Sequence, residues 1–128
     1  MQREQVPVAS PLGATIGYSR AVRAGDLVFV SGTTATSPDG SALHPGDAGK
    51  QAEVVLERIA AALRELGASL KDVVETRIYV TDMSLWQAVG AAHGAVFKDI
   101  RPASTLVEVS ALIYPELLVE ISAIASTA

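Results

Sequence analysis

The sequence predicts a single α+β domain in which two helices cover one face of a mixed β-sheet. The chain has 128 residues, which suits one ordinary domain and is too short for two. Two stretches, at about 48–66 and 84–97, repeat apolar residues at helical spacing. Five shorter apolar or alternating stretches are predicted to be strands, at 18–23, 27–31, 73–80, about 104–109 and about 117–125. The predicted element order is therefore β-β-α-β-α-β-β.

The N-terminal part is predicted to be an arm followed by a hairpin and a loop. Residues 1–15 carry two prolines and no clear periodicity, so we expect an irregular arm, with residues 16–128 forming the domain. Residues 24–26, Ala-Gly-Asp, separate the first two strands and are typical of a short hairpin turn. Residues 36–49 are rich in proline and glycine and predict a loop.

The first helix has both end signals and a continuous apolar stripe. Asp47 is the expected N-cap, because its side chain can accept from a free N–H of the first turn. Gly67 is the expected left-handed residue that ends the helix. Apolar residues recur at three- and four-residue steps, at Ala52, Val55, Ile59, Leu63 and Leu66.

The second helix is expected to begin at Ser84, where Ser84 and Gln87 fit a capping box. Its stripe consists of Trp86, Val89, His93 and Phe97. Gly90 and Gly94 weaken it by about 1 kcal/mol each relative to alanine, so packing must hold it.

The strand at 73–80 predicts a sheet with two different faces. Strict alternation places Val74, Thr76, Ile78 and Val80 on one face and Val73, Glu75, Arg77 and Tyr79 on the other. With the helices on one side, the second face mixes charged groups with large apolar residues. Such a face is too apolar for water and too charged for a monomer core. We therefore expect self-association that buries it, with clefts between protomers collecting its polar groups.

Composition excludes several functional classes. Ten basic and 14 acidic residues give a net charge of −4, and no basic run is present, so nucleic-acid binding is disfavoured. The chain has no cysteine, which excludes disulfides, thiolate zinc sites and a cysteine nucleophile. No uninterrupted apolar segment is long enough to span a membrane, and the N-terminus does not resemble a signal peptide. We expect a cytoplasmic protein with no nucleic-acid partner and no membrane partner.

Several short motifs follow one another in a family-like order. They are Ile16-Gly17-Tyr18-Ser19-Arg20-Ala21-Val22, Ser31-Gly32, Gln51 at a helix start, Tyr79-Val80-Thr81-Asp82-Met83, Arg101-Pro102-Ala103, and Val119-Glu120-Ile121-Ser122-Ala123-Ile124-Ala125. Together, from about residue 16 to 125, they resemble the RidA/YjgF family, also called the reactive-intermediate deaminase or L-PSP endoribonuclease family. No single motif is specific, but the ordered set is.

The resemblance implies a chorismate-mutase-like fold assembled as a homotrimer, with three clefts between neighbouring subunits. Active members hydrolyse small-molecule enamines and imines, such as 2-aminoacrylate, to keto acids and ammonia. They use no metal and no cofactor. The trimer agrees with the self-association that strand alternation already suggests.

The largest departure from the family pattern lies after Pro102-Ala103. Active members have an arginine there that clamps the substrate carboxylate, whereas this chain has Ser104, which supplies no positive charge. Arg101 is either a substitute anchor or a surface contact, and the same two interpretations hold for Arg20 and Arg23. We expect Ser104 and Arg101 to contact the substrate.

Three further candidates come from the resemblance. Glu120 corresponds to the residue that orients the attacking water, and its apolar neighbours favour a raised pKa; the alternative is an exposed or cross-paired glutamate. Tyr18 corresponds to a cleft tyrosine that binds a planar substrate, or it is an ordinary half-buried tyrosine. Ser31 lines the same pocket, or its hydroxyl bonds to backbone.

Other positions also differ from common members. Gly90, His93, Thr33 and Leu106 stand where asparagine, an aromatic residue, glutamine and cysteine are frequent, which indicates a divergent subgroup with a different ligand. His93 can titrate near neutrality, but a lone histidine on an apolar stripe is more often a packed one. With only one other histidine, at His44, a zinc site is not expected.

Two functions from different classes remain. The first is a hydrolase of C=N or enamine bonds, with Glu120 as the catalytic residue. The second is a non-catalytic trimer that binds a small metabolite or has a regulatory role, which the missing arginine favours. A ribonuclease is disfavoured by the acidic balance and the absence of a basic patch.

Overall fold

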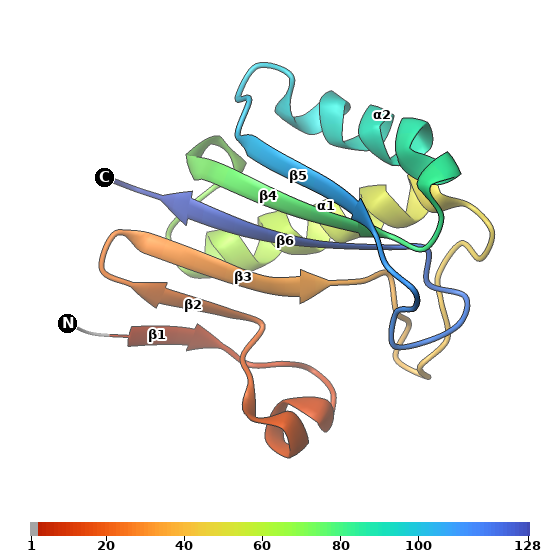
Figure 1. Ribbon diagram of the computed structural model, residues 1–128. Helices are drawn as coiled ribbons and strands as arrows, with labels where there is room; N and C mark the ends of the chain where they lie inside the picture. The colour runs from red at the N-terminus through yellow and green to blue at the C-terminus, as the bar shows by residue number, and fades with distance from the viewer. Residues whose placement is uncertain (1–2) are drawn as a thin grey trace.

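The computed structural model describes residues 3–128 and has one sheet with two helices packed on it (Figure 1). The strands are β1 (Arg3–Val6), β2 (Ala21–Ala24), β3 (Leu27–Thr33), β4 (Val73–Val80), β5 (Ala103–Glu108) and β6 (Val119–Ser126). The helices are α1 (Ala48–Glu65) and α2 (Trp86–Phe97), and short helical turns lie at Gly13–Gly17, Leu70–Asp72 and Met83–Leu85. The α+β class with a mixed sheet is confirmed.

The sheet has the strand order β1-β2-β3-β6-β4-β5. β4 and β5 are parallel, as their connection through α2 requires, and the remaining pairs are antiparallel. The last strand in sequence, β6, therefore lies in the middle of the sheet, between β3 and β4 (Figure 1). This position places the residues of β6 at the centre of the molecule.

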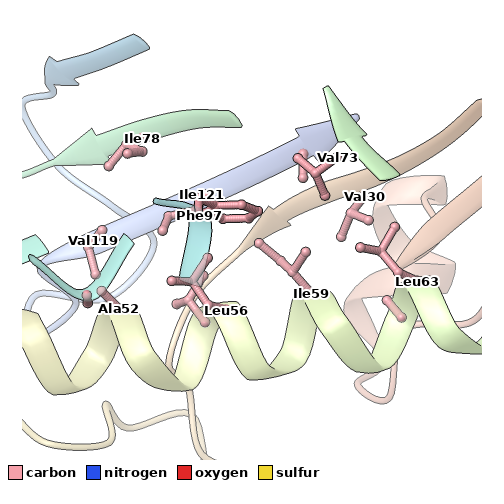
Figure 2. Packing of buried hydrophobic residues seen from close by; sticks show 14 of the residues in the cluster. Val30, Ala52, Leu56, Ile59, Leu63, Val73, Ile78, Phe97, Val119 and Ile121 are labelled. Carbon is pink, nitrogen blue, oxygen red and sulfur yellow. The ribbon is translucent and has the colours of Figure 1, made fainter. Parts of the chain in front are cut away.

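The core lies between the sheet and the two helices. Figure 2 shows Leu56, Ile59 and Leu63 of α1 pointing at the sheet, where Val30 and Ile121 meet them. The stripe predicted for the first helix is buried along its whole length. The apolar area removed from water, at about 25 cal/mol per Å², is the main force that holds the helices to the sheet.

The ends of α1 are formed as the sequence predicts. Asp47 is the N-cap, and its Oδ1 accepts from the Lys50 N–H at 3.0 Å. Gly67 has a φ of 77°, the left-handed conformation that ends a helix at low cost in glycine. Among residues 3–128, no helix is long and apolar enough to cross a membrane.

The N-terminal segment differs from the prediction for residues 1–15. Part of it forms β1, which pairs antiparallel with β2, from Arg3 opposite Ala24 to Val6 opposite Ala21. β1 is an edge strand and its side chains are mostly exposed, so it shows none of the apolar alternation by which a strand is predicted from sequence.

The start of α2 also differs from the prediction. The carboxylate of Asp82 accepts from the Ser84 N–H at 2.8 Å and caps a 3₁₀ turn, so the α-helix begins only at Trp86. The predicted capping box of Ser84 and Gln87 is wrong. Trp86 is 52% exposed and therefore lies outside the buried stripe.

At the start of β4 the buried and exposed side chains are the opposite of those predicted. A β-bulge interrupts the pairing with β6 between Val73 and Glu75. Val73 therefore joins Thr76 and Ile78 on the buried face, while Val74 is 49% exposed, the reverse of the strict alternation expected for these two valines.

We expect Gly94→Ala to stabilise the protein by about 0.5–1 kcal/mol, because alanine loses less backbone entropy than glycine in a helix interior. A Cβ at Gly94 meets no atom within 4 Å. Urea unfolding of the two proteins measures the difference. An unchanged or lower midpoint would show that glycine is needed at this position of α2.

Candidate functional site

The face of the sheet opposite the helices carries the candidate catalytic carboxylate. Glu120 stands between Val119 and Ile121, which are fully buried in the core. Because neighbouring residues of a strand point to opposite faces, the Glu120 side chain projects from the other face. Tyr79 of β4 lies directly opposite Glu120 in the β4–β6 pairing and shares that face.

A pocket of about 280 Å³ surrounds the Glu120 carboxylate. Its lining residues come from β3, β4, β6 and the segment after β5, and they are Gly32, Tyr79, Val109, Ala111, Leu112, Glu120 and Ser122. The wall is about equally polar and apolar, and its polar side chains are one carboxylate, one phenol and one hydroxyl. Such a pocket suits a small ligand without a carboxylate of its own, whose reacting atom meets Glu120.

Gly32 makes room for the carboxylate. A Cβ at this position would collide with Oε2 of Glu120 and would lie 2.9 Å from its Cδ. The missing side chain of Gly32 therefore allows Glu120 to lie against the backbone of β3, and Gly32 holds the carboxylate on one side.

Opposing influences act on the ionisation of Glu120. Burial raises the pKa of its carboxyl above the usual value, and the charge of Arg20 acts in the opposite direction. The carboxyl is therefore a stronger base than an exposed glutamate and becomes protonated more readily. Both properties suit a group that takes a proton from water and returns it to a leaving group.

Arg20 lies behind the pocket wall rather than in the pocket. Its Nη2 donates to the carbonyl of Gly32 at 2.8 Å and to that of Ser31 at 3.3 Å. Burial lowers the pKa of Arg20, and the nearby Tyr18 and Glu120 oppose this effect. Arg20 therefore contributes positive charge beside Glu120 while its Nη2 holds the β3 backbone, and its buried Nε has no hydrogen-bond partner among the described residues.

The structure places two other predicted site residues near Arg20: Tyr18, which precedes β2, and Ser31 of β3. The Tyr18 ring lines a second pocket of about 280 Å³, formed with Gln5 and Pro7. The Ser31 hydroxyl donates to the Ser19 carbonyl at 2.7 Å, which is the backbone bond considered from the sequence. Tyr18 thus remains available to a ligand, whereas the Ser31 hydroxyl proton is already used.

Ser104 lies on the opposite face of the sheet from Glu120. It is paired with Thr76 in the parallel β4–β5 ladder, and the Thr76 hydroxyl donates to Ser104 Oγ at 2.8 Å. Thr76 is fully buried on the helix side of the sheet. One chain therefore does not bring Ser104 and Glu120 to the same ligand.

The two remaining arginine candidates have structural contacts. Arg101 is exposed, has a φ of 55°, and donates through Nε to the Lys98 carbonyl at 3.0 Å. Arg23 donates to the Leu66 carbonyl at 2.6 Å and to the Thr127 hydroxyl at 2.7 Å, which ties the first hairpin to the end of α1.

Tyr79, Ser122 and Thr76 are site residues that sequence reasoning did not select. The alternation of β4 placed Tyr79 on the polar face, but only the register with β6 shows that it lies opposite Glu120. Thr76 appears as a core residue in the sequence, and its two polar contacts become visible only in the fold.

We expect the stability of the protein to depend on pH through Glu120. Its pKa is raised by folding, so the folded state binds the proton more tightly than the unfolded state. The free energy of unfolding therefore falls as pH rises from the unfolded pKa through the folded one. Glu120→Gln removes this fall, so it unfolds at a higher temperature than the wild type at pH 7. The difference in melting temperature between Glu120→Gln and the wild type should shrink as the pH is lowered. A difference that stays the same in acid would contradict the raised pKa of Glu120.

Among residues 3–128, no group of three or more histidine, aspartate and glutamate side chains is placed to hold a metal ion.

Comparison with known proteins identifies the family. The model of the family described as endoribonuclease L-PSP matches residues 8–127, nearly the whole chain. The chain belongs to the endoribonuclease L-PSP family. Membership in this family, which includes RutC and YjgF proteins, confirms the resemblance carried by the ordered motifs.

Relatives within the L-PSP family cover most of the chain. A RutC family protein of Pyrococcus abyssi is 36% identical over 108 residues, 84% of each chain. The 3-aminoacrylate deaminase RutC of Acinetobacter baylyi is 35% identical over 108 residues, 84% of this chain and 85% of the relative.

Solved structures agree with the fold. The crystal structure of Rv2704 from Mycobacterium tuberculosis, a member of the YjgF/YER057c/UK114 family, has 49% sequence identity and a TM-score of 0.88. The match covers 98% of this chain and 100% of that one. The L-PSP fold is chorismate-mutase-like, as the resemblance implied.

Proposed function

We propose that this chain is a metal-free hydrolytic deaminase of small enamines, imines or related C=N compounds, which it binds in clefts between the subunits of a homotrimer. The observation that carries this proposal is the Glu120 carboxylate, which lies against Gly32 in a pocket and has its pKa raised by burial. The 35% identity with a 3-aminoacrylate deaminase supports the reaction class.

Glu120 has the properties that imine hydrolysis requires. The ionised carboxylate takes a proton from water as the water oxygen attacks the imine carbon. The carbinolamine formed from the protonated imine takes that proton on its nitrogen, which leaves as ammonia, and the hydroxyl proton is lost as the carbonyl group forms. A group whose pKa is raised toward neutrality performs both transfers better than an ordinary glutamate.

The face of the sheet opposite the two helices has exposed apolar side chains that support self-association. Leu27, Phe29 and Val107 are 41%, 42% and 40% exposed, although all three belong to central or paired strands. Exposed apolar groups on a sheet face favour burial against another copy of the chain. A trimer also provides the second wall that the Glu120 pocket lacks in one chain.

The wall of the Glu120 pocket disfavours anionic substrates. None of the side chains described around it is a lysine or an arginine, and Arg20 uses its Nη2 on backbone carbonyls. Ser104 supplies no charge in place of the family arginine. We therefore propose substrates without the usual α-carboxylate, formed and consumed in the cytoplasm.

Ammonia release from freshly generated imines and enamines tests this function. We expect the wild type to release ammonia above the buffer rate and Glu120→Ala to fall to that rate. Glu53→Ala, which removes an exposed carboxylate on α1, is the matched control and should retain full activity. Equal rates for the wild type and Glu120→Ala would reject the proposal.

A non-catalytic metabolite-binding trimer is the second candidate, and Ser104 in place of the family arginine is the observation that favours it. On this hypothesis the protein is stabilised by a metabolite but releases no ammonia. A ligand at 100 times its Kd adds about 2.7 kcal/mol to the free energy of unfolding, which a thermal-shift screen detects. Glu120-dependent ammonia release would decide against it.

A further inference from the structure

We propose that Ser104, Thr76 and His93 form a proton relay that exchanges a proton with the substrate from the side opposite Glu120. The relay rests on the proposed function, because the substrate it serves is the enamine or imine of that reaction. It lies between β4, β5 and α2, away from the pocket lined by Glu120. Two hydroxyl groups and one imidazole, joined by hydrogen bonds, connect the interior to the exposed Ser104.

Each group of the relay lies within hydrogen-bonding distance of the next. Thr76 Oγ1 lies 2.9 Å from His93 Nε2 and 2.8 Å from Ser104 Oγ. Thr76 is fully buried, His93 is half-buried, and Ser104 is exposed. The His93 ring is held by Phe97, whose ring centroid lies 4.6 Å away. The Ser104 hydroxyl is therefore the group of the three that is most open to a ligand.

The direction of the hydrogen bonds follows from the single proton of Thr76. Since Thr76 donates to Ser104, it accepts from His93, whose Nε2 must then carry a hydrogen. Ser104 already accepts one bond and is free to donate its own proton outward. When both hydrogen bonds are reversed, Ser104 donates to Thr76 and Thr76 donates to Nε2 of His93, which then carries no hydrogen, so Ser104 can accept a proton from outside. The same chain therefore passes a proton in either direction.

Enamine hydrolysis needs a proton source other than the carboxylate that activates water. Protonated His93 gives its Nε2 proton to Thr76, Thr76 gives its proton to Ser104, and Ser104 gives its proton to the enamine carbon, which forms an iminium ion. Glu120 then takes a proton from the attacking water and returns it to the nitrogen, which leaves as ammonia. The protonated carbonyl oxygen left behind gives its proton back along the relay to His93, so that protons and charge balance.

The relay requires a second copy of the chain at the same substrate. Ser104 and Glu120 project from opposite faces of one sheet, so the Ser104 end of one subunit serves a substrate held by Glu120 of a neighbour. Burial lowers the pKa of His93, so its protonated form gives up a proton more readily than free imidazolium. The substitution of serine for arginine at residue 104 thus exchanges a fixed charge for a proton-transfer group.

Four substitutions separate proton transfer from packing. Thr76→Val keeps the shape but removes the hydroxyl, and Thr76→Ser keeps the hydroxyl. His93→Gln keeps a hydrogen-bonding group that does not exchange protons at neutral pH, and Ser104→Ala removes the exposed end. We expect Thr76→Val, His93→Gln and Ser104→Ala each to lower kcat for enamine hydrolysis about 10²-fold with little change in KM, as for loss of a general acid. Thr76→Ser should stay within about threefold of the wild type.

The relay also predicts that losses do not add. Thr76→Val combined with His93→Gln should be no slower than either single variant, because each already breaks the same path. Thermal unfolding and oligomer mass check that the variants fold, and the exposed Ser104→Ala provides a readout even if the buried variants do not.

The outcomes distinguish the relay from the proposed function. Glu120-dependent ammonia release that survives Ser104→Ala and His93→Gln overturns the relay alone. A wild type whose ammonia release does not exceed that of Glu120→Ala overturns both. Glu120-dependent release that is lost in Thr76→Val and restored in Thr76→Ser supports the relay.

Discussion

Gly32→Ala is expected to reduce ammonia release about 10²-fold or more, nearly to the level of Glu120→Ala, while leaving the protein folded. The added Cβ collides with the Glu120 carboxylate, so the flexible end of that side chain must move away from β3. A misplaced catalytic group loses the orientation on which proton transfer depends. Because a side-chain end moves and no backbone does, the change in stability should be small.

Activity and melting temperature measured on the same preparation test this prediction. Gly49→Ala is the control, because a Cβ there meets its nearest atoms at 3.6 Å, an ordinary contact distance. It should keep wild-type activity. A Gly32→Ala protein that retains full activity would show that the position of the carboxylate against β3 is not needed.

Gln51→Leu is expected to destabilise the protein by about 3 kcal/mol or more. The Gln51 amide is fully buried and links α1 to the chain just before β6. Its Nε2 donates to the carbonyl of Glu116 at 3.0 Å, and its Oε1 accepts from the N–H of Leu118 at 2.9 Å. Leucine fills a similar volume but leaves these part-buried backbone groups without their Gln51 partners, at about 1–3 kcal/mol each.

This loss is large relative to a total stability of about 5–15 kcal/mol. Urea unfolding measures it, and Gln87→Leu, an exposed change on α2, is the matched control that should stay close to the wild type. Because Leu118 is two residues before Glu120, weakened activity below the unfolding transition is expected as well. An unfolding midpoint for Gln51→Leu equal to that of the control would contradict the role assigned to this amide.

Local rules were sufficient for the elements whose signals lie within the element itself. The hairpin turn forms within the predicted residues 24–26, at Gly25-Asp26, and the Asp47 cap and the Gly67 helix end form as predicted. β1 and the bulge after Val73 could not be predicted, since both depend on pairing with a distant strand rather than on local pattern.

The candidate site was predictable in part for the same reason. Apolar neighbours and the family resemblance both indicated Glu120. Expecting Ser104 at the same ligand required knowledge of the face each strand presents, which the sequence does not contain. The fold separates the two residues, and only a second copy of the chain can bring them together.

Mixing two inactive variants tests the shared cleft most directly. Glu120→Ala removes the carboxylate that one subunit contributes to the proposed cleft. Ser104→Trp blocks the part of the cleft that the neighbouring subunit contributes. Each variant alone should be nearly inactive. If every cleft combines Glu120 of one subunit with Ser104 of its neighbour, refolding an equal mixture restores about a quarter of the wild-type rate, because that fraction of clefts receives both intact halves. A mixture no more active than the separate variants would show that the site does not lie between subunits.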